Sequence, residues 1–401
     1  MSERAAEASA GPGAPADRDD ELSRRIASAR TVARNTALDV DSKARFPSEA
    51  VDALRRHGLL DPHLGLGPEH PGRYAALTRT VKAIGAECGS TGLVLAMHHS
   101  LVETLAAGCA DQDRLHELLG GQGALVAGVT SERGTATIRE SITHCTPAPG
   151  GRTTLTKRTP AASYAEHADV VLLTARRSHD AAASDQVLVC GRRDQVSVRP
   201  TGPWDTLGMR GTRSGPADIE CDVPTEQVLA RPFGELASEA LLPTSHLLWA
   251  SCWYGIAADA LRRTRDSLRR RPEARSAPGT HPRVLALGEL YRGLGDLDAR
   301  IEQFARRLDA DRGPQSLRAQ QSRALAANQL RLSAAETSVR VAVGAMSCMG
   351  LASYHSAEVS SLSLSRHVRD LLSAPLMVNA DTVRSASAQL ALATRDGDGP
   401  A

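Results

Sequence analysis

Long apolar runs are absent from this sequence of 401 residues. No stretch of about 18 apolar residues occurs, so nothing in it predicts a helix that spans a membrane. The first residues, MSERAAEASAGPGAPADRDDE, also lack the apolar core that a signal peptide requires. We therefore expect a soluble, cytoplasmic protein that has no membrane partner.

Cysteine pairs with the spacing of metal or redox motifs are missing as well. The seven cysteines lie singly, with neither Cys-x-x-Cys spacing nor a histidine partner at ligand distance. This pattern predicts reduced thiols and no metal site. Basic runs interleaved with aromatic residues are also missing, and the formal net charge of +2 is close to neutral. We therefore expect no nucleic-acid partner.

The sequence does contain enough apolar residues, 41% of the total, for a large core divided over two or three structural units. The pattern of apolar, polar and turn residues changes along the chain and predicts three folded regions between two tails. The polar ends are expected to be disordered because they offer too little apolar surface to offset the entropy of ordering. The predicted regions are a tail at 1–21, a helical domain at 22–120, a β domain at 121–232, a helical bundle at 233–393 and a tail at 394–401.

Local patterns support this division. The segment FPSEAVDALRRHGLL has helical spacing with Gly58 as its stop, and STGLVLAMHHSLVETLAAG is apolar on nearly every side, as in a buried helix. Four short runs, GALVAGVTS, ADVVLLTA, DQVLVCG and ADIECDV, are rich in Val, Leu and Ile and are separated by turn residues. Helical periodicity returns at about residue 235 and continues to residue 393.

A resemblance to a known family rests on six segments that occur in order along the chain. They resemble the landmarks of the acyl-CoA dehydrogenase superfamily over about residues 22–393. The resemblance implies a mainly α fold with a helical N-terminal domain, a central β-barrel and a C-terminal four-helix bundle. The segments are FPSEAVDALRRHGLL, VTSERGTA, ADVVLLTA, WDTLGMRGTRSGPADIECDVPTEQVL, WYGIAADALRRTRDSLRRR and SRHVRDLLSA.

The family chemistry that the resemblance implies is removal of two hydrogens from an acyl thioester. A glutamate takes the α proton while a flavin accepts a hydride from the β carbon. The family places this glutamate about eight residues after an Arg-Asp element or, less often, about ten residues before a glycine that matches Gly255. In this sequence Val378 occupies the first position, counted from Asp370, and Ser245 occupies the second.

Two nearby residues are candidates for the missing base. Asp381 is the acid nearest to the first position, and its alternative role is that of a helix cap or surface acid. His246 stands beside Ser245, and its alternative role is that of a hydrogen-bonded core histidine next to Trp249.

The resemblance further implies a flavin, FAD or alternatively FMN, bound between β domain and bundle and usually between subunits. Arg271 lies sixteen residues after Gly255, where the family has the arginine that contacts the pyrophosphate. Hydroxyl and glycine residues match other cofactor positions, and Tyr164 or Ser163 is near the position of an aromatic residue that packs on the flavin. The predicted cofactor-binding residues are Thr130, Ser131, Ser163, Arg271 and Gly350, and the predicted substrate-binding residues are Thr135, Arg210 and His98.

Three functions remain open from the sequence. The first is dehydrogenation of an acyl group carried by CoA or an acyl carrier protein, with an electron-transfer partner. The second is a flavin monooxygenase of the same fold, which uses oxygen and needs no carboxylate base. The third is a flavin-free descendant with a non-redox role. The Ala-, Arg- and Asp-rich composition is typical of high-GC bacteria, where such proteins often serve specialised metabolism. Family habit predicts a homodimer or homotetramer.

Overall fold

The computed structural model describes residues 15–272, 281–311 and 316–393. The predicted tail at 394–401 and residues 1–14 of the other tail lie outside the described residues. Residues 15–21 are helical, so the expectation of disorder is wrong for them. Acidic residues favour the N-terminal turns of a helix, and Asp19 forms an ion pair with Arg79 at 2.8 Å. The helix then buries Leu22 one turn further on.

The N-terminal region is entirely helical, as predicted. Helices α3 and α4 meet at Cys88, and both contribute buried apolar side chains to the core. The 3₁₀ turn η1 connects α2 to α3 across the end of α4. The elements are α1 (Pro15–Ser42), α2 (Ser48–Arg56), η1 (Pro62–Gly65), α3 (Arg73–Glu87), α4 (Gly89–Gly108) and α5 (Gln112–Leu119).

The β region contains seven strands in two sheets. One sheet has the order β1-β4-β5, with β1 parallel to β4 from the pair Val126 and Val170 onward, and the other has the antiparallel order β2-β3-β7-β6. A bridge between His144 and Arg176 joins the two sheets along one side. The strands of the expected β domain thus form two hydrogen-bonded sheets joined along one side. The strands are β1 (Val126–Val129), β2 (Thr146–Ala148), β3 (Arg152–Thr159), β4 (Val170–Arg176), β5 (Gln186–Arg192), β6 (Val196–Pro200) and β7 (Ala217–Pro224).

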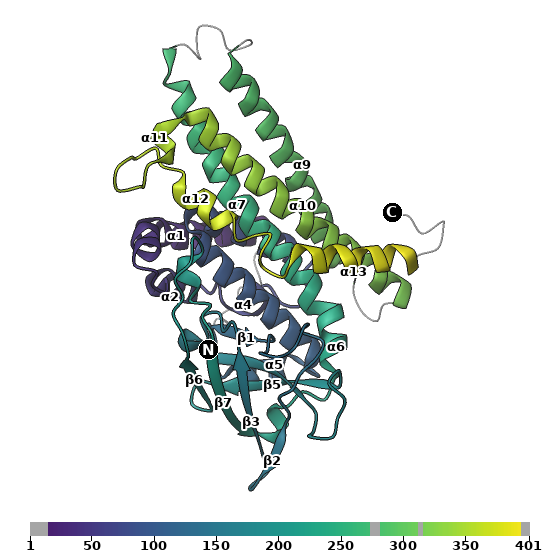
Figure 1. Ribbon diagram of the computed structural model, residues 1–401. Coiled ribbons are helices and arrows are strands. Elements are labelled where there is room, and N and C mark those ends of the chain that lie inside the picture. The colour runs from purple at the N-terminus through teal and green to yellow at the C-terminus, as the bar shows by residue number, and fades with distance from the viewer. Residues whose placement is uncertain (1–14, 273–280, 312–315, 394–401) are drawn as a thin grey trace, which may run out of the picture.

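The C-terminal region is a bundle whose long helices rise from the β unit (Figure 1). It begins with α6 (Phe233–Leu236), and one π-helical turn, η5 (Ala237–Leu241), connects α6 to α7 (Leu242–Arg269). Helix α13 crosses and packs against α10 (Figure 1). The other helices are α9 (Pro282–Ala310), α10 (Leu317–Met349), α11 (Leu351–Tyr354), α12 (Ser365–Leu371) and α13 (Ala380–Ala393). None of the described helices is long and apolar enough to cross a membrane.

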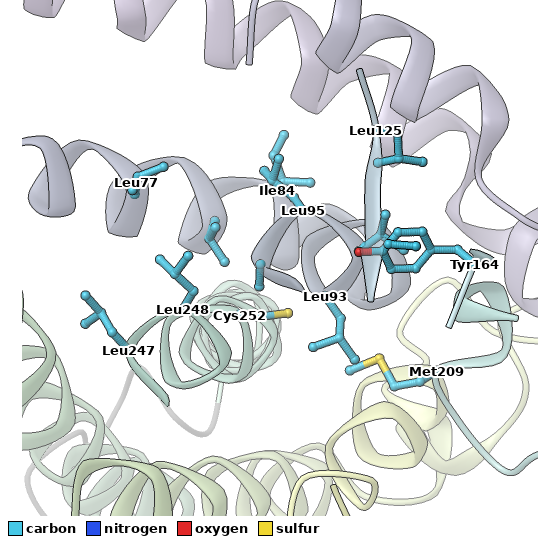
Figure 2. Close-up of a cluster of buried hydrophobic side chains, with 14 of the residues drawn as sticks. Leu77, Ile84, Leu93, Leu95, Leu125, Tyr164, Met209, Leu247, Leu248 and Cys252 are labelled. Carbon is cyan, nitrogen blue, oxygen red and sulfur yellow. The ribbon is translucent and has the colours of Figure 1, made fainter. Parts of the chain in front are cut away.

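The core is continuous across the three regions. Figure 2 shows Leu247, Leu248 and Cys252 of α7 beside side chains from α3 and α4, with Tyr164 and Met209 of the β region on the same cluster. Each such side chain contributes about 1.5–3 kcal/mol of stability when it is fully buried. The three regions therefore share one apolar interior.

Glycines allow α7 to approach α3 closely. A Cβ atom on Gly255 would overlap the backbone oxygen of Lys82, and one on Gly85 would meet the backbone of Cys252. A backbone atom cannot move aside as the end of a flexible side chain can, so even one methyl group would push the two helices apart.

We predict that Gly255→Ala lowers the free energy of unfolding by at least about 2 kcal/mol, because the new methyl group overlaps α3. The matched control is Gly288→Ala on α9, where an added Cβ meets no described atom within 4 Å. Because alanine is the better helix former, the control should gain up to about 1 kcal/mol. Denaturant unfolding measures both, and equal effects at the two positions would contradict this packing.

Candidate functional site

The Arg-Asp element of α12 joins the bundle to the other two regions. The guanidinium of Arg369 donates to the carboxylate of Asp41 at 3.0 Å and to the backbone oxygen of Leu207 at 2.7 Å. Oδ1 of Asp370 accepts the backbone N–H of Met209 at 2.7 Å. Burial raises the pKa of Asp370 to about 6. This element therefore connects α1, the β region and the bundle at a single point.

The two positions at which the resembled family places its carboxylate both lie near one buried arginine. Arg331 of α10 donates to the backbone oxygens of Met377 and Val378, the first of the two positions. His246, next to Ser245, lies near enough to Arg331 for the charge of the guanidinium to affect it. Burial lowers the pKa of His246 to about 3, and the charge of Arg331 contributes to this shift. The two positions thus converge in space, and neither holds an acid.

Arg331 has an unusual electrostatic environment for a buried cation. Its side chain is fully buried, and among the described residues its Nε and Nη1 have no hydrogen-bond partner and no carboxylate forms an ion pair with it. Burial lowers its pKa to about 10. Nδ1 of His246 is also buried without a described partner. Unsatisfied buried donors are costly, so Arg331 is suited to an electron-rich group that is supplied from outside the chain.

Asp381 does not reach this point. It lies in the first turn of α13 with its side chain 82% exposed, and it forms an ion pair with Arg384 at 2.9 Å. Arg384 also contacts Glu336 at 3.0 Å. The structure therefore places Asp381 at the surface, whereas His246 is buried near Arg331.

The predicted flavin-binding hydroxyls gather at the carboxyl end of β1. Oγ of Ser131 lies 2.9 Å from Oγ1 of Thr159 and 3.4 Å from the backbone oxygen of Ala161. Among the described residues, the half-buried hydroxyls of Thr130 and Ser163 have no hydrogen-bond partner. Two available hydroxyls are a suitable donor set for the polar edge of a flavin ring.

Tyr164 cannot replace the missing aromatic partner of a flavin. It is 1% exposed, and its hydroxyl donates to the backbone oxygen of Val126 at 2.9 Å. Figure 2 shows its ring beside Leu125 in the core. The interpretation of Tyr164 as a possible stacking residue was wrong, because its left-handed backbone, with φ at 41°, turns the ring inward.

Arg271 and Gly350 come together, but far from these hydroxyls. Nη2 of Arg271 donates to the backbone oxygen of Met349 at 3.0 Å, next to Gly350 at the end of α10. The β region contacts the opposite end of α7, through α6 (Figure 1). Helix α7 has 28 residues, which is about 42 Å at 1.5 Å per residue, and Arg271 lies just beyond its far end. One chain therefore does not join the two halves of the predicted cofactor site.

The predicted substrate residues have structural partners. His98 is fully buried, with Nε2 donating to the backbone oxygen of Leu60 at 2.8 Å and Nδ1 accepting the N–H of Val126 at 3.1 Å. Burial lowers its pKa to about 4. Both ring nitrogens are occupied, so the substrate-binding expectation for His98 was wrong. The hydroxyl of Thr135 donates to the backbone oxygen of Glu132 at 3.1 Å.

Arg210 lines a surface hollow of about 510 Å³ together with Asp41 and Arg369. Its guanidinium donates to the backbone oxygen of Asp41 at 2.9 Å and to the carboxylate of Asp205 at 2.9 Å. Arg210 thus connects the β region to α1.

Comparison with solved structures identifies the architecture. TdsC from Paenibacillus sp. A11-2, solved with FMN, has a TM-score of 0.79 and 20% identity, with 93% of this chain and 98% of that chain covered. The chain has the acyl-CoA dehydrogenase fold. Butyryl-CoA dehydrogenase from Megasphaera elsdenii superposes with a TM-score of 0.77 at 15% identity, over the same shares of the two chains.

KijD3 in complex with dTDP is a third similar structure. Its TM-score is 0.78 and its identity is 23%, with 96% of this chain and 98% of that chain covered. KijD3 has also been solved with FMN and dTDP-3-amino-2,3,6-trideoxy-4-keto-3-methyl-D-glucose. No family model matches the sequence. No curated protein matches it either. The likeness thus lies in the acyl-CoA dehydrogenase fold, with sequence identities below 25%.

Two buried polar clusters within the acyl-CoA dehydrogenase fold escaped sequence reasoning. Glu132 accepts hydrogen bonds from Ser141 and Thr143 and lies 3.4 Å from the ammonium of Lys157. Glu103 lies on α4, whose sequence is otherwise almost wholly apolar. Its carboxylate pairs with His63 in η1. A lone acid on a helix that is apolar on nearly every side is the signal that would have drawn attention to Glu103.

We predict that Asp370→Asn changes how stability depends on pH. Because folding raises the pKa of Asp370 from 3.8 to about 6, its contribution to stability is full below pH 4 and is lost as the pH rises towards 6. Two pKa units correspond to roughly 3 kcal/mol. Asparagine keeps an acceptor for the Met209 N–H but does not ionise.

The variant should therefore gain stability relative to the wild type between pH 4 and pH 7, as measured by denaturant unfolding at several pH values. The matched control, Asp381→Asn, alters an exposed acid and should show no such trend. A wild-type-to-variant difference that is constant with pH would contradict the assignment.

Proposed function

We propose that the chain is a flavin-dependent oxidoreductase that uses oxygen to oxidise a small organic substrate, as a monooxygenase. The observation that carries this proposal is the convergence of both expected base positions on Arg331 and His246. Removal of an α proton from a thioester requires a positioned base. Neither of the two positions at which this fold can place that carboxylate holds one, and a buried cation lies near both. Monooxygenation does not require that carboxylate.

The similar structures support this choice. One TdsC structure carries the name dibenzothiophene monooxygenase, and TdsC and KijD3 were both solved with FMN. Butyryl-CoA dehydrogenase is similar in fold as well, which is why thioester dehydrogenation, favoured by the sequence, remains the second candidate. That reaction would need a base from another part of the chain.

The residues of this chain fit a flavin in two parts. The hydroxyls of Thr130 and Ser163 would hold the polar edge of the ring, and Arg271 beside Gly350 would hold a phosphate of FAD or FMN. Since α7 separates the two groups, we propose that Arg271 of a second copy completes each site in a homo-oligomer. A bound flavin would supply two-electron redox chemistry and a reaction with oxygen.

Arg331 and His246 differ in their charge in this proposal. With a pKa of about 3, His246 is neutral at physiological pH. Arg331 remains charged, since its pKa is about 10. A fixed cation in a water-poor site stabilises negative charge that develops on the substrate, and it needs no reorganisation to do so.

We predict that the purified protein binds FMN or FAD and that the double variant Thr130→Val, Ser163→Ala binds it at least about tenfold more weakly, because two hydrogen bonds of about 1 kcal/mol are lost. Quenching of flavin fluorescence measures the affinity. Ser178→Ala, at an exposed loop position, is the matched control and should bind as the wild type does. Failure to bind either flavin would favour the flavin-free alternative.

We also predict that butyryl-CoA and longer acyl-CoA thioesters leave the visible absorption of the flavin-loaded protein unchanged under anaerobic conditions. Without a carboxylate at Val378 or Ser245, the α proton has no acceptor there, and the flavin is not reduced. The spectrum before and after addition is the measurement, and dithionite, which reduces flavin directly, is the positive control. Bleaching by a thioester would reverse the order of the two candidates.

A further inference from the structure

A buried carboxylate exists near the start of α7, although the two expected positions lack one. Glu103 of α4 is 5% exposed, and its Oε1 lies 2.7 Å from Nδ1 of His63 in η1. The hydroxyl of Tyr74 donates to Oε2 at 3.2 Å, and the guanidinium of Arg73 lies 3.3 Å from the same oxygen. Burial acts to raise the pKa of Glu103, but His63 and then Arg73 outweigh it and hold the pKa below its usual range. Glu103 is therefore ionised.

This arrangement fixes the tautomer of His63. An ionised carboxylate only accepts hydrogen bonds, so Nδ1 carries a hydrogen, and in the neutral imidazole Nε2 carries the lone pair. Nε2 is buried and has no partner among the described residues. His99 presents a second such nitrogen, because its Nε2 donates to the backbone oxygen of Leu59 at 3.0 Å while its Nδ1 has no described partner. Burial and the neighbouring His98 lower the pKa of His99.

The backbone at His63 is strained and firmly held. His63 and Leu64 both adopt left-handed conformations, with φ of 54° and 57°. Each such residue costs on the order of 1–3 kcal/mol and persists only where the surroundings impose it. Arg25 holds this left-handed conformation from one side, because its guanidinium donates to the backbone oxygens of Gly58 and Leu64 at 2.6 and 3.2 Å. The histidine is therefore held in one orientation.

The pair also lies close to the proposed active site. The hydroxyl of Tyr74, which contacts Glu103, forms a hydrogen bond with the side chain of Thr244. Thr244 immediately precedes Ser245, the second position at which this fold can place its catalytic acid. The His63–Glu103 pair thus lies one side chain away from the start of α7.

We propose that Nε2 of His63 accepts a proton from the substrate and that Glu103 is its positioning residue. An O–H, N–H or S–H bond of the substrate breaks, its proton binds Nε2, and its electron pair stays on the heteroatom. The resulting imidazolium is stabilised by Glu103. The inference rests on the proposed function and narrows its substrate class to protic molecules such as phenols and amines, which become more nucleophilic when they lose a proton.

Diethyl pyrocarbonate, which acylates unprotonated imidazole nitrogens, tests the lone pair on Nε2 in the full-length protein. Peptide mass spectrometry should find His63 modified and His98 unmodified, since both ring nitrogens of His98 are hydrogen bonded. Exposed His179 reports that the reagent is active. An unmodified His63 beside a modified His179 would overturn the proposal, because Nε2 would then be sealed in the core.

The protic probe 4-nitrophenol tests the proton transfer itself, because its phenolate absorbs at longer wavelength than the phenol. The wild type should shift the probe's spectrum towards the phenolate, and the probe should slow acylation of His63. His63→Asn, which tolerates the left-handed backbone, should lose the spectral shift. Retention of the shift in this variant, or no shift with the wild type, would overturn the role of His63.

Glu103→Gln tests the positioning role and should reduce both the acylation of His63 and the spectral shift. Unchanged values would remove Glu103 from the proposal. If this variant does not fold, the wild-type comparison of His63 with His98 still decides the main claim. None of these measurements needs flavin, so failure to bind FMN or FAD would refute the proposed function separately.

Discussion

The close approach of α7 to α3 and α4 is the constraint on which the rest of the structure depends. Glycines make it possible, since Gly85, Gly92 and Gly255 lie where any side chain would overlap a neighbouring helix. The side chain of Trp253, also on α7, is fully buried in the core. Because α7 also packs against α10 and meets the β region through α6, its position fixes how the three regions face one another. The groups that surround its first turns are therefore held in one arrangement.

That arrangement places buried charges of opposite sign on different sides of α7. Arg331 approaches from α10 without a carboxylate partner among the described residues, whereas Glu103 approaches from α4 and is compensated by Arg73 and His63. Buried charges are expensive even when they are paired, and apolar replacements often stabilise a protein. A stable core alone does not require either group, so their presence supports a chemical role.

Sequence reasoning predicted the order of the regions, because periodicity and composition are properties of local segments. It also predicted one cofactor site for Arg271, Gly350 and the hydroxyls of the β region, whereas the structure places Arg271 and Gly350 together at the far end of α7. It failed for Tyr164 and His98, whose side chains turn into the core.

The direction in which a side chain points depends on backbone angles and on packing between distant segments, which spacing does not encode. Tyr164 turns inward because of a single left-handed residue, and His98 is satisfied by Leu60 and Val126, which lie far from it in sequence. The pair of His63 and Glu103, forty residues apart, was hidden for the same reason.

The nature of the proposed base also separates the two candidate reactions. An imidazole is matched to heteroatom protons whose acidity is near that of the imidazolium, because proton transfer is efficient when the two pKa values are close. The α proton of a thioester is far less acidic and requires a base placed against the carbon beside the flavin. His63 is connected through Glu103 and Tyr74 to Thr244 at the start of α7, beside the Ser245 position. Its chemistry and its location therefore both favour activation of a heteroatom for reaction with oxygen over removal of hydrogen from carbon.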